Sequence, residues 1–207
     1  MRLLADLHNH SCLSPCASLE MSPRRIARTA RERGIGLLGL TDHNAALNCP
    51  AFAEACRLEG IVPLFGIEAS SIEEVHVLVL FDAVEAALDF GSLLHAHLPR
   101  VRLDRRRFGD QVVVNEAEEV LELPDQYLGM ALDLGFDELC AEGARRSGLV
   151  IPAHIDRPMF SVSSQLGFLP EGPYDALESM REPQKAICRG YPLVSGSDAH
   201  YPEHVGR

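Results

Sequence analysis

The chain has 207 residues, of which 46% are hydrophobic and 24% charged, and its formal net charge is −11. This length fits a single domain, residues 1–207, with enough chain to bury a sizeable core. The acidic charge argues against a tight, non-specific grip on long nucleic acid, which needs cations against the phosphates, although bound divalent metals would reverse that sign locally.

Two further classes of protein are not expected from the composition. The sequence has no run of about 18 apolar residues, so we expect no membrane span, and its N-terminus lacks the basic and apolar stretches of a signal peptide. The six cysteines form no CxxC pair. Because a chain of this size does not need disulfides, we expect reduced thiols in a cytoplasmic protein.

Strand-like and helix-like segments alternate along the chain. The apolar run 2–8 predicts a buried strand, and 22–34 predicts a helix that Ser22 caps, with Pro23 at its first position and Gly34 at its end. Further strands are expected at 35–43, 61–68, 74–81, 110–115, 149–154 and 191–200, and further helices at 50–60, 83–96, 136–148 and 182–190. This alternation is typical of parallel βαβ units and predicts an α/β fold.

Side chains that bind metal ions occur at or just past the C-terminal end of nearly every expected strand. They are His8, His43, Glu68, His154, Asp198 and His200, while His76 lies inside a strand. In a parallel barrel these strand ends meet on one face, where active sites are built. A single histidine at a strand end is usually structural, but packing does not explain so many. The sequence therefore predicts a metal site.

The spacing of these residues supports shared ligation. In "HNH" (8–10) and "DAH" (198–200) the chemically active side chains stand two residues apart. Residues i and i+2 of an extended chain point the same way, so both members of each pair can reach one ion.

Three carboxylates have candidate roles beside these histidines. Asp42 is either a ligand or a residue that orients His43, because a carboxylate bonded to the second ring nitrogen fixes the tautomer of a ligand histidine. Asp6 is a candidate for the same orienting role beside His8. Glu68 can bridge two ions with its two oxygens. Histidine with carboxylate suits Zn, Mn or Fe better than Ca or Mg.

The motifs "DLHNHS", "LTDHN", "GIE", "EVHVL", "AHIDRP" and "GSDAH", in that order, resemble the PHP (polymerase and histidinol phosphatase) domain over residues 6–200. The resemblance implies a distorted seven-stranded (β/α) barrel, a trinuclear metal site at the C-terminal strand ends, and phosphoesterase activity. It implies the following ligands: His8, His10, Glu68 and Asp198 at one ion; Glu68, His76 and His154 at a second; His43 and His200 at a third, with a ligand from the 15–16 region.

The 15–16 region departs from the pattern of that family. Many members have Ser-Asp-Gly there, and some have a histidine, whereas this chain has Ser14-Pro15-Cys16. Because proline cannot bind a metal ion, Cys16 is the candidate ligand, and a thiolate favours Zn or Fe over Mn. The alternative is a buried thiol beside a weaker third position. The chain also ends seven residues after His200, so we expect the final helix that the resemblance implies to be short or missing.

The function that we predict is hydrolysis of a phosphate ester by a metal-activated hydroxide at a di- or trinuclear site. Metal ions lower the pKa of bound water and offset the charge that develops on phosphoryl oxygens. Asp198 is the candidate to orient the hydroxide. Arg157 is the candidate to grip phosphate with its guanidinium fork, the alternative being a surface ion pair. The leaving-group acid is either His200 or a metal-bound water.

The small size of the chain favours a small phosphorylated substrate over long nucleic acid. Candidates are histidinol phosphate, a nucleotide or a nucleoside bisphosphate, and then a short oligonucleotide. Two other functions stay open. One is a non-catalytic metal-binding or regulatory module. The other is a C–N amidohydrolase, many of which bridge two metals with a carboxylated lysine, although the single lysine here, Lys185, follows His154.

Two patterns favour a structural interpretation. The "HAH" at 95–97 lies in an expected helix, where residues two apart diverge. The "RVRLDRRR" at 100–107 has five arginines in eight residues. Such a run is typical of a solvated face, although it could also attract an anionic substrate or nucleic acid.

Overall fold

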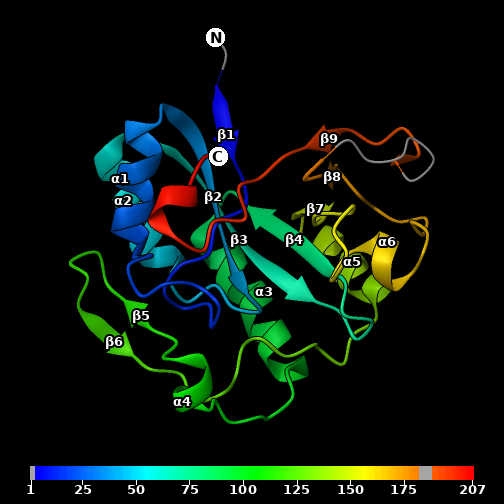
Figure 1. Cartoon of the computed structure of the whole chain (residues 1–207), viewed down its shortest axis with the longest axis horizontal. Coiled ribbons are helices and arrows are strands. Elements are labelled where there is room, and N and C mark those ends of the chain that lie inside the picture. The colour runs from blue at the N-terminus through cyan, green and yellow to red at the C-terminus, as the bar shows by residue number, and fades with distance from the viewer. Residues whose placement is uncertain (1–2, 182–187) are drawn as a thin grey trace.

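The main sheet orders its strands β1-β2-β3-β4-β7 in the computed structural model, which describes residues 3–181 and 188–207 (Figure 1). The first three strands are mutually parallel, but β4 runs antiparallel to both of its neighbours. The uniformly parallel arrangement that we expected is therefore wrong. A parallel connection needs about a dozen residues or more, and only the short segment 71–75 joins β3 to β4. The strands are β1 (Leu4–Asp6), β2 (Ile35–His43), β3 (Val62–Ser70), β4 (His76–Phe81) and β7 (Leu149–Pro152).

The longer helices match the expected ones. The first begins where predicted, because the Ser22 hydroxyl accepts a hydrogen bond from the backbone N–H of Arg25. Gly60 ends the second with a φ of 67°. The helix expected at 182–190 falls largely outside the described residues. The helices are α1 (Pro23–Glu32), α2 (Cys49–Glu59), α3 (Val84–His97) and α5 (Phe136–Arg145), with shorter turns α4 (Arg105–Phe108), α6 (Val162–Gln165) and η1 (Pro202–His204).

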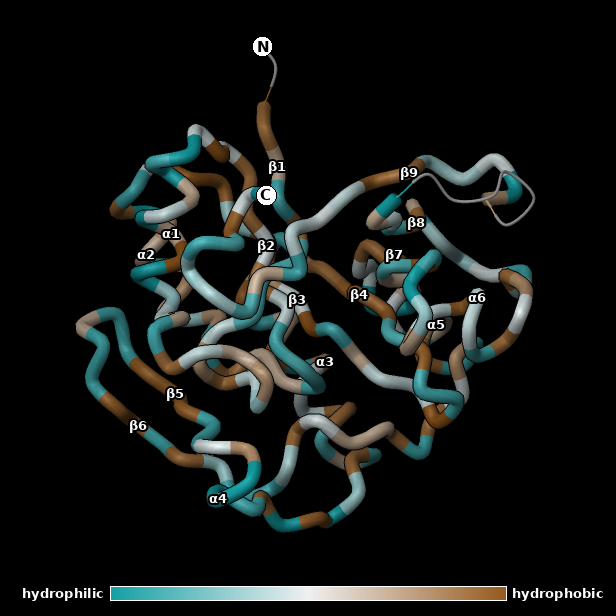
Figure 2. The backbone as a smooth tube through the Cα atoms, viewed as in Figure 1, coloured by the Kyte–Doolittle hydropathy of each residue, from teal (hydrophilic) through white to brown (hydrophobic). Residues whose placement is uncertain are grey.

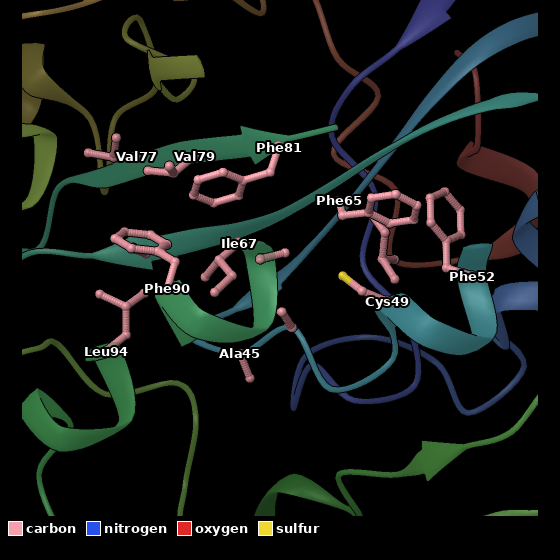
Figure 3. Close-up of a cluster of buried hydrophobic side chains, with 14 of the residues drawn as sticks. Ala45, Cys49, Phe52, Phe65, Ile67, Val77, Val79, Phe81, Phe90 and Leu94 are labelled. Carbon is pink, nitrogen blue, oxygen red and sulfur yellow. The ribbon is translucent and has the colours of Figure 1, made fainter. Parts of the chain in front are cut away.

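The larger hydrophobic core lies between the outer face of the sheet and the helices (Figure 3). Alternate residues of β4 point outward to this core, among them Val79 and Phe81. They pack with residues of β3 and with Phe90 of α3, which is fully buried. Burying such a side chain contributes roughly 1.5–3 kcal/mol. This core holds the two strands that carry Glu68 and His76.

A smaller hydrophobic cluster lies on the inner face of the sheet. Strands β8 (Leu177–Glu178) and β9 (Leu193–Val194) form a separate parallel pair beside it. The N–H of Ile155, just after β7, donates to the carbonyl of Glu178 over 2.8 Å. Near β1, Asn9 pairs with Ala199 in a parallel bridge. The α/β class is confirmed. The described strands form an open five-stranded sheet and separate pairs, so the closed seven-stranded barrel is not confirmed.

Residues 98–131 connect α3 to the segment that precedes α5, and we call this connection the insertion. It contains α4 and a hairpin of β5 (Val113–Val114) and β6 (Val120–Glu122), so the strand expected over 110–115 is short. Figure 2 shows hydrophobic residues along this hairpin. Asn44, directly after β2, donates to the carbonyls of Leu128 and Met130, both over 2.8 Å. The insertion is thus anchored beside His43.

Within the described ranges, no helix is both long enough and apolar enough to cross a membrane.

Candidate metal centre

Two distant segments run side by side and bring together three of the first four predicted ligands, His8, His10 and Asp198. Because Asn9 and Ala199 form a bridge, the residues flanking each of them face one place. The Nε2 atoms of His8 and His10 lie 3.2 Å apart. Asp198 Oδ1 lies 3.3 Å from the first nitrogen and 3.2 Å from the second.

Glu68 lies at the centre of the candidate site. The register of β2 and β3 pairs it with His43, whose Nδ1 lies 3.2 Å from Glu68 Oε2. Oε2 also lies 3.2 Å from His10 Nε2. The antiparallel direction of β4 places its first residue at the same edge of the sheet, because Ser70 pairs with that residue. Glu68 Oε1 lies 3.3, 2.8 and 3.0 Å from ring nitrogens of His8, His76 and His154, respectively.

A third group of donors adjoins the first two. Nitrogens of His10, His43 and His200 lie within 4.8 Å of one another. The Sγ of Cys16 lies 3.0 Å from His200 Nε2, while His200 Nδ1 lies 2.8 Å from the carbonyl oxygen of Asp198. The structure therefore brings all nine predicted metal-site residues into one region.

The chemistry of this donor set fits divalent metal ions. His43 Nδ1 is buried without a hydrogen bond, although it lies 3.2 Å from a carboxylate oxygen. Buried polar atoms nearly always have a partner, and imidazoles crowded around two carboxylates are the ligands that Zn, Mn and Fe prefer. One group contains His8, His10, Glu68 and Asp198, and another contains His43, Glu68 and His76.

The electrostatics of the centre show the same demand for positive charge. Burial lowers the pKa of His10, but the hydrogen bonds that its ring donates to the Asp198 and Glu68 carboxylates raise it to about 9. Burial raises the pKa of Glu68, yet the surrounding imidazoles hold it well below its usual value. His200 lies at the margin, where burial lowers its pKa to about 4. Two buried carboxylates thus attract protons onto their neighbours, where a cation would serve equally well.

Sequence analysis missed Glu178, which orients His8. Its two carboxylate oxygens lie 3.0 and 2.9 Å from His8 Nδ1, and it also accepts the N–H of His154 over 2.9 Å. Asp6 does not have the role that we expected, because its carboxylate accepts the N–H groups of Ser197 and Gly206 instead. One signal for Glu178 was present in the sequence: a glutamate among apolar residues is expected to be buried, and a buried carboxylate needs a partner.

The tight packing around Glu178 depends on Gly196. A Cβ atom at position 196 would lie 2.6 Å from the Cβ of His8 and would also collide with the Glu178 carboxylate. The glycine in "GSDAH" therefore permits the contact between the carboxylate and the imidazole.

Ser14 was also missed, and it explains the role of Asp42. Its hydroxyl donates to Asp42 Oδ1 over 2.7 Å, so it accepts from His10 Nδ1 at 3.0 Å and from the N–H of His43 at 3.1 Å. This arrangement puts the proton of His10 on Nδ1 and leaves Nε2 open toward the centre. Asp42 therefore orients His10 through Ser14 and belongs to none of the donor groups in the described chain.

Strained backbone occurs at the centre. His154 has a φ of 30°, Phe160 of 59° and Asp198 of 47°. Such values are unfavourable for side chains other than glycine and cluster at functional sites.

Two adjoining cavities of about 260 and 310 Å³ open onto the candidate ligands. Arg157 lines the larger one, and its Nη1 lies 2.6 Å from Asp198 Oδ2. Its side chain is 40% exposed, so it faces both the centre and the solvent. Phe160 lines both cavities and stacks on the His76 ring at 4.8 Å. The "HAH" histidines lie elsewhere on α3, where His97 pairs with Asp133.

The model of the PHP domain family matches residues 6–141, so the chain belongs to this family of metal-dependent hydrolases, as the motifs predicted. Structural similarity extends further. Endonuclease Q from Pyrococcus furiosus aligns with a TM-score of 0.66 at 19% identity, over 96% of this chain and 48% of that one. This chain thus spans about half the length of the endonuclease.

Two smaller proteins share the fold over most of their length. An amidohydrolase from Chromobacterium violaceum has a TM-score of 0.64 at 20% identity, covering 99% of this chain and 90% of that one. A protein from Bifidobacterium adolescentis, described as a metal-dependent phosphoesterase, has a TM-score of 0.64 at 16% identity, covering 97% and 88%. A search of curated proteins found no match.

Proposed function

We propose that this protein hydrolyses phosphate esters with two or three divalent ions, Zn, Mn or Fe, held at the candidate centre. The observation that carries the proposal is the buried Glu68 carboxylate, which contacts ring nitrogens of five histidines. Bound ions supply an activated water and offset charge on the phosphoryl oxygens. The proposed ligands are His8, His10, Cys16, His43, Glu68, His76, His154, Asp198 and His200.

Three residues have proposed roles in the reaction itself. Asp198 orients the attacking water, because its Oδ1 faces the ligand imidazoles at 3.2–3.3 Å. Arg157 exchanges its ion pair with Asp198 for hydrogen bonds to a phosphate oxygen when substrate enters the 310 Å³ cavity. His200 has two alternative roles, because an imidazole that binds an ion has no free proton to give. It either completes the third position, in which case a water on a bound ion would protonate the leaving group, or it serves as that acid itself, since it lines the same cavity.

The substrate that we propose is a small phosphorylated molecule, for which histidinol phosphate, nucleotides, nucleoside bisphosphates and short oligonucleotides are candidates. The size of the two cavities supports this choice. The structural relatives include a lesion-specific endonuclease and an amidohydrolase. The reaction class is therefore tested directly. Lys185, relevant to the amidohydrolase alternative, lies outside the described residues.

Two further proposals concern how the barrel closes and where the protein is located. We propose that β8 and β9 complete a seven-stranded barrel between β7 and β1, supported by the bonds at Ile155 and Asn9. We also propose a cytoplasmic setting, because the thiols of Cys12, Cys49 and Cys140 are buried and form no disulfide.

Phosphate release tests the function. Metal-loaded wild-type protein is compared with His10→Ala and with His95→Ala, an exposed histidine on α3, on a panel containing histidinol phosphate, mononucleotides and 3′,5′-bisphosphonucleotides. We expect His10→Ala to abolish turnover and reduce metal content, and His95→Ala to change neither. Unchanged turnover in His10→Ala would refute the site assignment. No turnover by metal-loaded wild-type protein would favour the C–N hydrolase or the non-catalytic module.

A further inference from the structure

We infer that the insertion 98–131 carries a binding track for single-stranded nucleic acid that leads to the metal centre. This inference rests on the proposed function and selects, among its candidate substrates, the short oligonucleotides. It is based on a row of aromatic and arginine side chains that the proposed reaction does not otherwise use.

The row begins inside the smaller cavity. Tyr127 lines this 260 Å³ cavity together with the candidate ligands Cys16 and His43. The Tyr127 ring stacks on Phe108 with 4.6 Å between centroids and 24° between planes. The guanidinium of Arg107 lies 4.9 Å from the centroid of the Phe108 ring. Stacked π-systems therefore continue from the metal centre to the surface at α4.

The row is held firmly in place. The N–H of Tyr127 donates to the carbonyl of Val101 over 2.8 Å. Gly129 packs against the tyrosine, since a Cβ there would lie 2.7 Å from its Cζ. The two hydrogen bonds from Asn44 to the neighbouring carbonyls tie this segment to the residue after His43. A platform fixed in this way loses little entropy when a ligand stacks on it.

Exposed arginines accompany the row, although the protein as a whole is acidic. Arg105 is occupied by Asp110 and Asp125, at 2.7 and 2.6 Å. Arg106 and Arg107 are exposed, and neither has an ion pair within residues 3–181 and 188–207. These two cations are free to meet an anion from solvent.

Single-stranded nucleic acid matches both features. Its bases stack on aromatic rings and on arginine, and its phosphates attract exposed arginines. An acidic peptide would satisfy the arginines but not the stacked rings. A small phosphomonoester at the metals would not reach Phe108 and Arg107, so a chain of several nucleotides is the ligand that uses the whole row.

The test compares an oligonucleotide with a minimal ester. Probes are a fluorescein-labelled hexanucleotide, as DNA and as RNA, and p-nitrophenyl phosphate. Variants are Tyr127→Leu, Arg107→Gln and Gly129→Ala, which keeps the tyrosine but displaces its ring; Arg28→Gln, an exposed arginine of α1, is the matched control. For each of the three variants we expect the ratio of kcat/KM for the hexanucleotide to that for the ester to fall by about tenfold.

Salt dependence gives an independent readout. Arg107→Gln should reduce the slope of log affinity against log salt by about one unit, whereas Arg28→Gln should not. If the ester is hydrolysed and the ratio is equal in wild type and variants, the track is refuted while the proposed function stands. If metal-loaded wild type hydrolyses neither probe and no phosphate ester of the substrate panel, the proposed function fails. Fluorescence anisotropy of the hexanucleotide then decides the track: weaker binding by the variants supports it, and equal binding overturns it.

Discussion

At the residue scale, Glu178 controls how His8 faces the metal centre. Its carboxylate accepts hydrogen bonds from two N–H groups, at His8 Nδ1 and at the backbone of His154. In Glu178→Gln the amide NH₂ would face one of them, and the charge would be lost. We expect metal affinity to fall by about 10–100-fold, measured by competition with a chromophoric chelator. The exposed Glu32→Gln is the control, and affinity equal to wild type would contradict the orienting role.

Cys16 decides the composition of the third metal position. Its Sγ is 3.0 Å from His200 Nε2, and the residue is exposed, so the alternative of a buried thiol is wrong. Desolvation of the sulfur inside the cavity and the nearby Glu68 raise its pKa to about 12, so it is a thiol without metal. A bound cation would deprotonate it. We expect the cobalt-substituted protein to show a thiolate charge-transfer absorption that disappears in Cys16→Ser. The buried Cys56→Ser controls for loss of any thiol, and a spectrum without that absorption in wild type would rule out the ligand.

Single residues also show how far sequence could predict the site. The pairs 8/10 and 198/200 were predictable because side chains alternate along an extended chain. Glu178 was not, because its contact with His8 joins residues 170 positions apart and depends on where β8 lies. Ser14 escaped notice because a hydroxyl carries no sign of which histidine it will meet. The role of Cys16 stays a prediction.

At the element scale, the main wrong prediction is the direction of β4, because the alternation of strand-like and helix-like segments indicated a parallel sheet. The short 71–75 connection was a signal for a hairpin. The error did not disturb the site, because reversing the strand moves its first residue, His76, to the edge where β3 ends. The helices were predictable from caps and from glycine stops. The strand expected at 191–200 is present only as the two residues of β9, and β8 was too short to show a period.

The segment between β9 and the bridge at Ala199 contains Gly196, and substitution of this glycine tests how tightly the segment packs. Gly196→Ala would place a methyl group 2.6 Å from the Cβ of His8 and against Glu178. Overpacking of this kind costs roughly 1–3 kcal/mol, so we expect a lower unfolding midpoint in denaturant and weaker metal binding. Gly135→Ala is the matched control, since its nearest new contact is at 3.4 Å. Equal effects of both substitutions would show that the contact with His8 is unimportant.

At the scale of the whole molecule, the centre concentrates negative charge inside an already acidic protein. The net charge is −11, and burial of Glu68 and Asp198 adds to the repulsion. In metal-free protein, protons on His8 and His10 offset that charge, because the pKa of each is raised in the folded state. Metal ions would displace those protons. Folding, protonation and metal loading are therefore linked.

This linkage predicts the pH dependence of stability without metal. The folded pKa of His10 is about 9, above the value of 6.5 for an unperturbed histidine. Below pH 6.5 both states bind the proton and the stabilisation is complete. As the pH rises toward 9, the unfolded chain releases protons that the folded chain keeps, so stability is lost. The slope is up to about 1.4 kcal/mol per pH unit for each histidine.

Other groups do not reverse this trend between pH 6.5 and 9. The pKa values of Glu68 and Asp198 are lowered, so their contribution is already constant there. The pKa values of His43 and His200 are lowered as well, so near pH 6.5 the unfolded chain still binds protons at these two residues that the folded chain does not. Their contribution therefore opposes the trend at pH 6.5 and fades by about pH 7.5, where unfolded histidines are largely neutral. Urea unfolding of chelator-treated protein at pH 6.5, 7.5 and 8.5 measures the effect. We expect the free energy of unfolding to decrease across the series, and the decrease to be smaller in His10→Ala.

Saturating zinc should stabilise the protein more at pH 8.5 than at pH 6.5, since fewer protons then compete with zinc for the ligands. Stability that is constant or rises with pH in the metal-free protein would show that the carboxylates are balanced by something other than these protons.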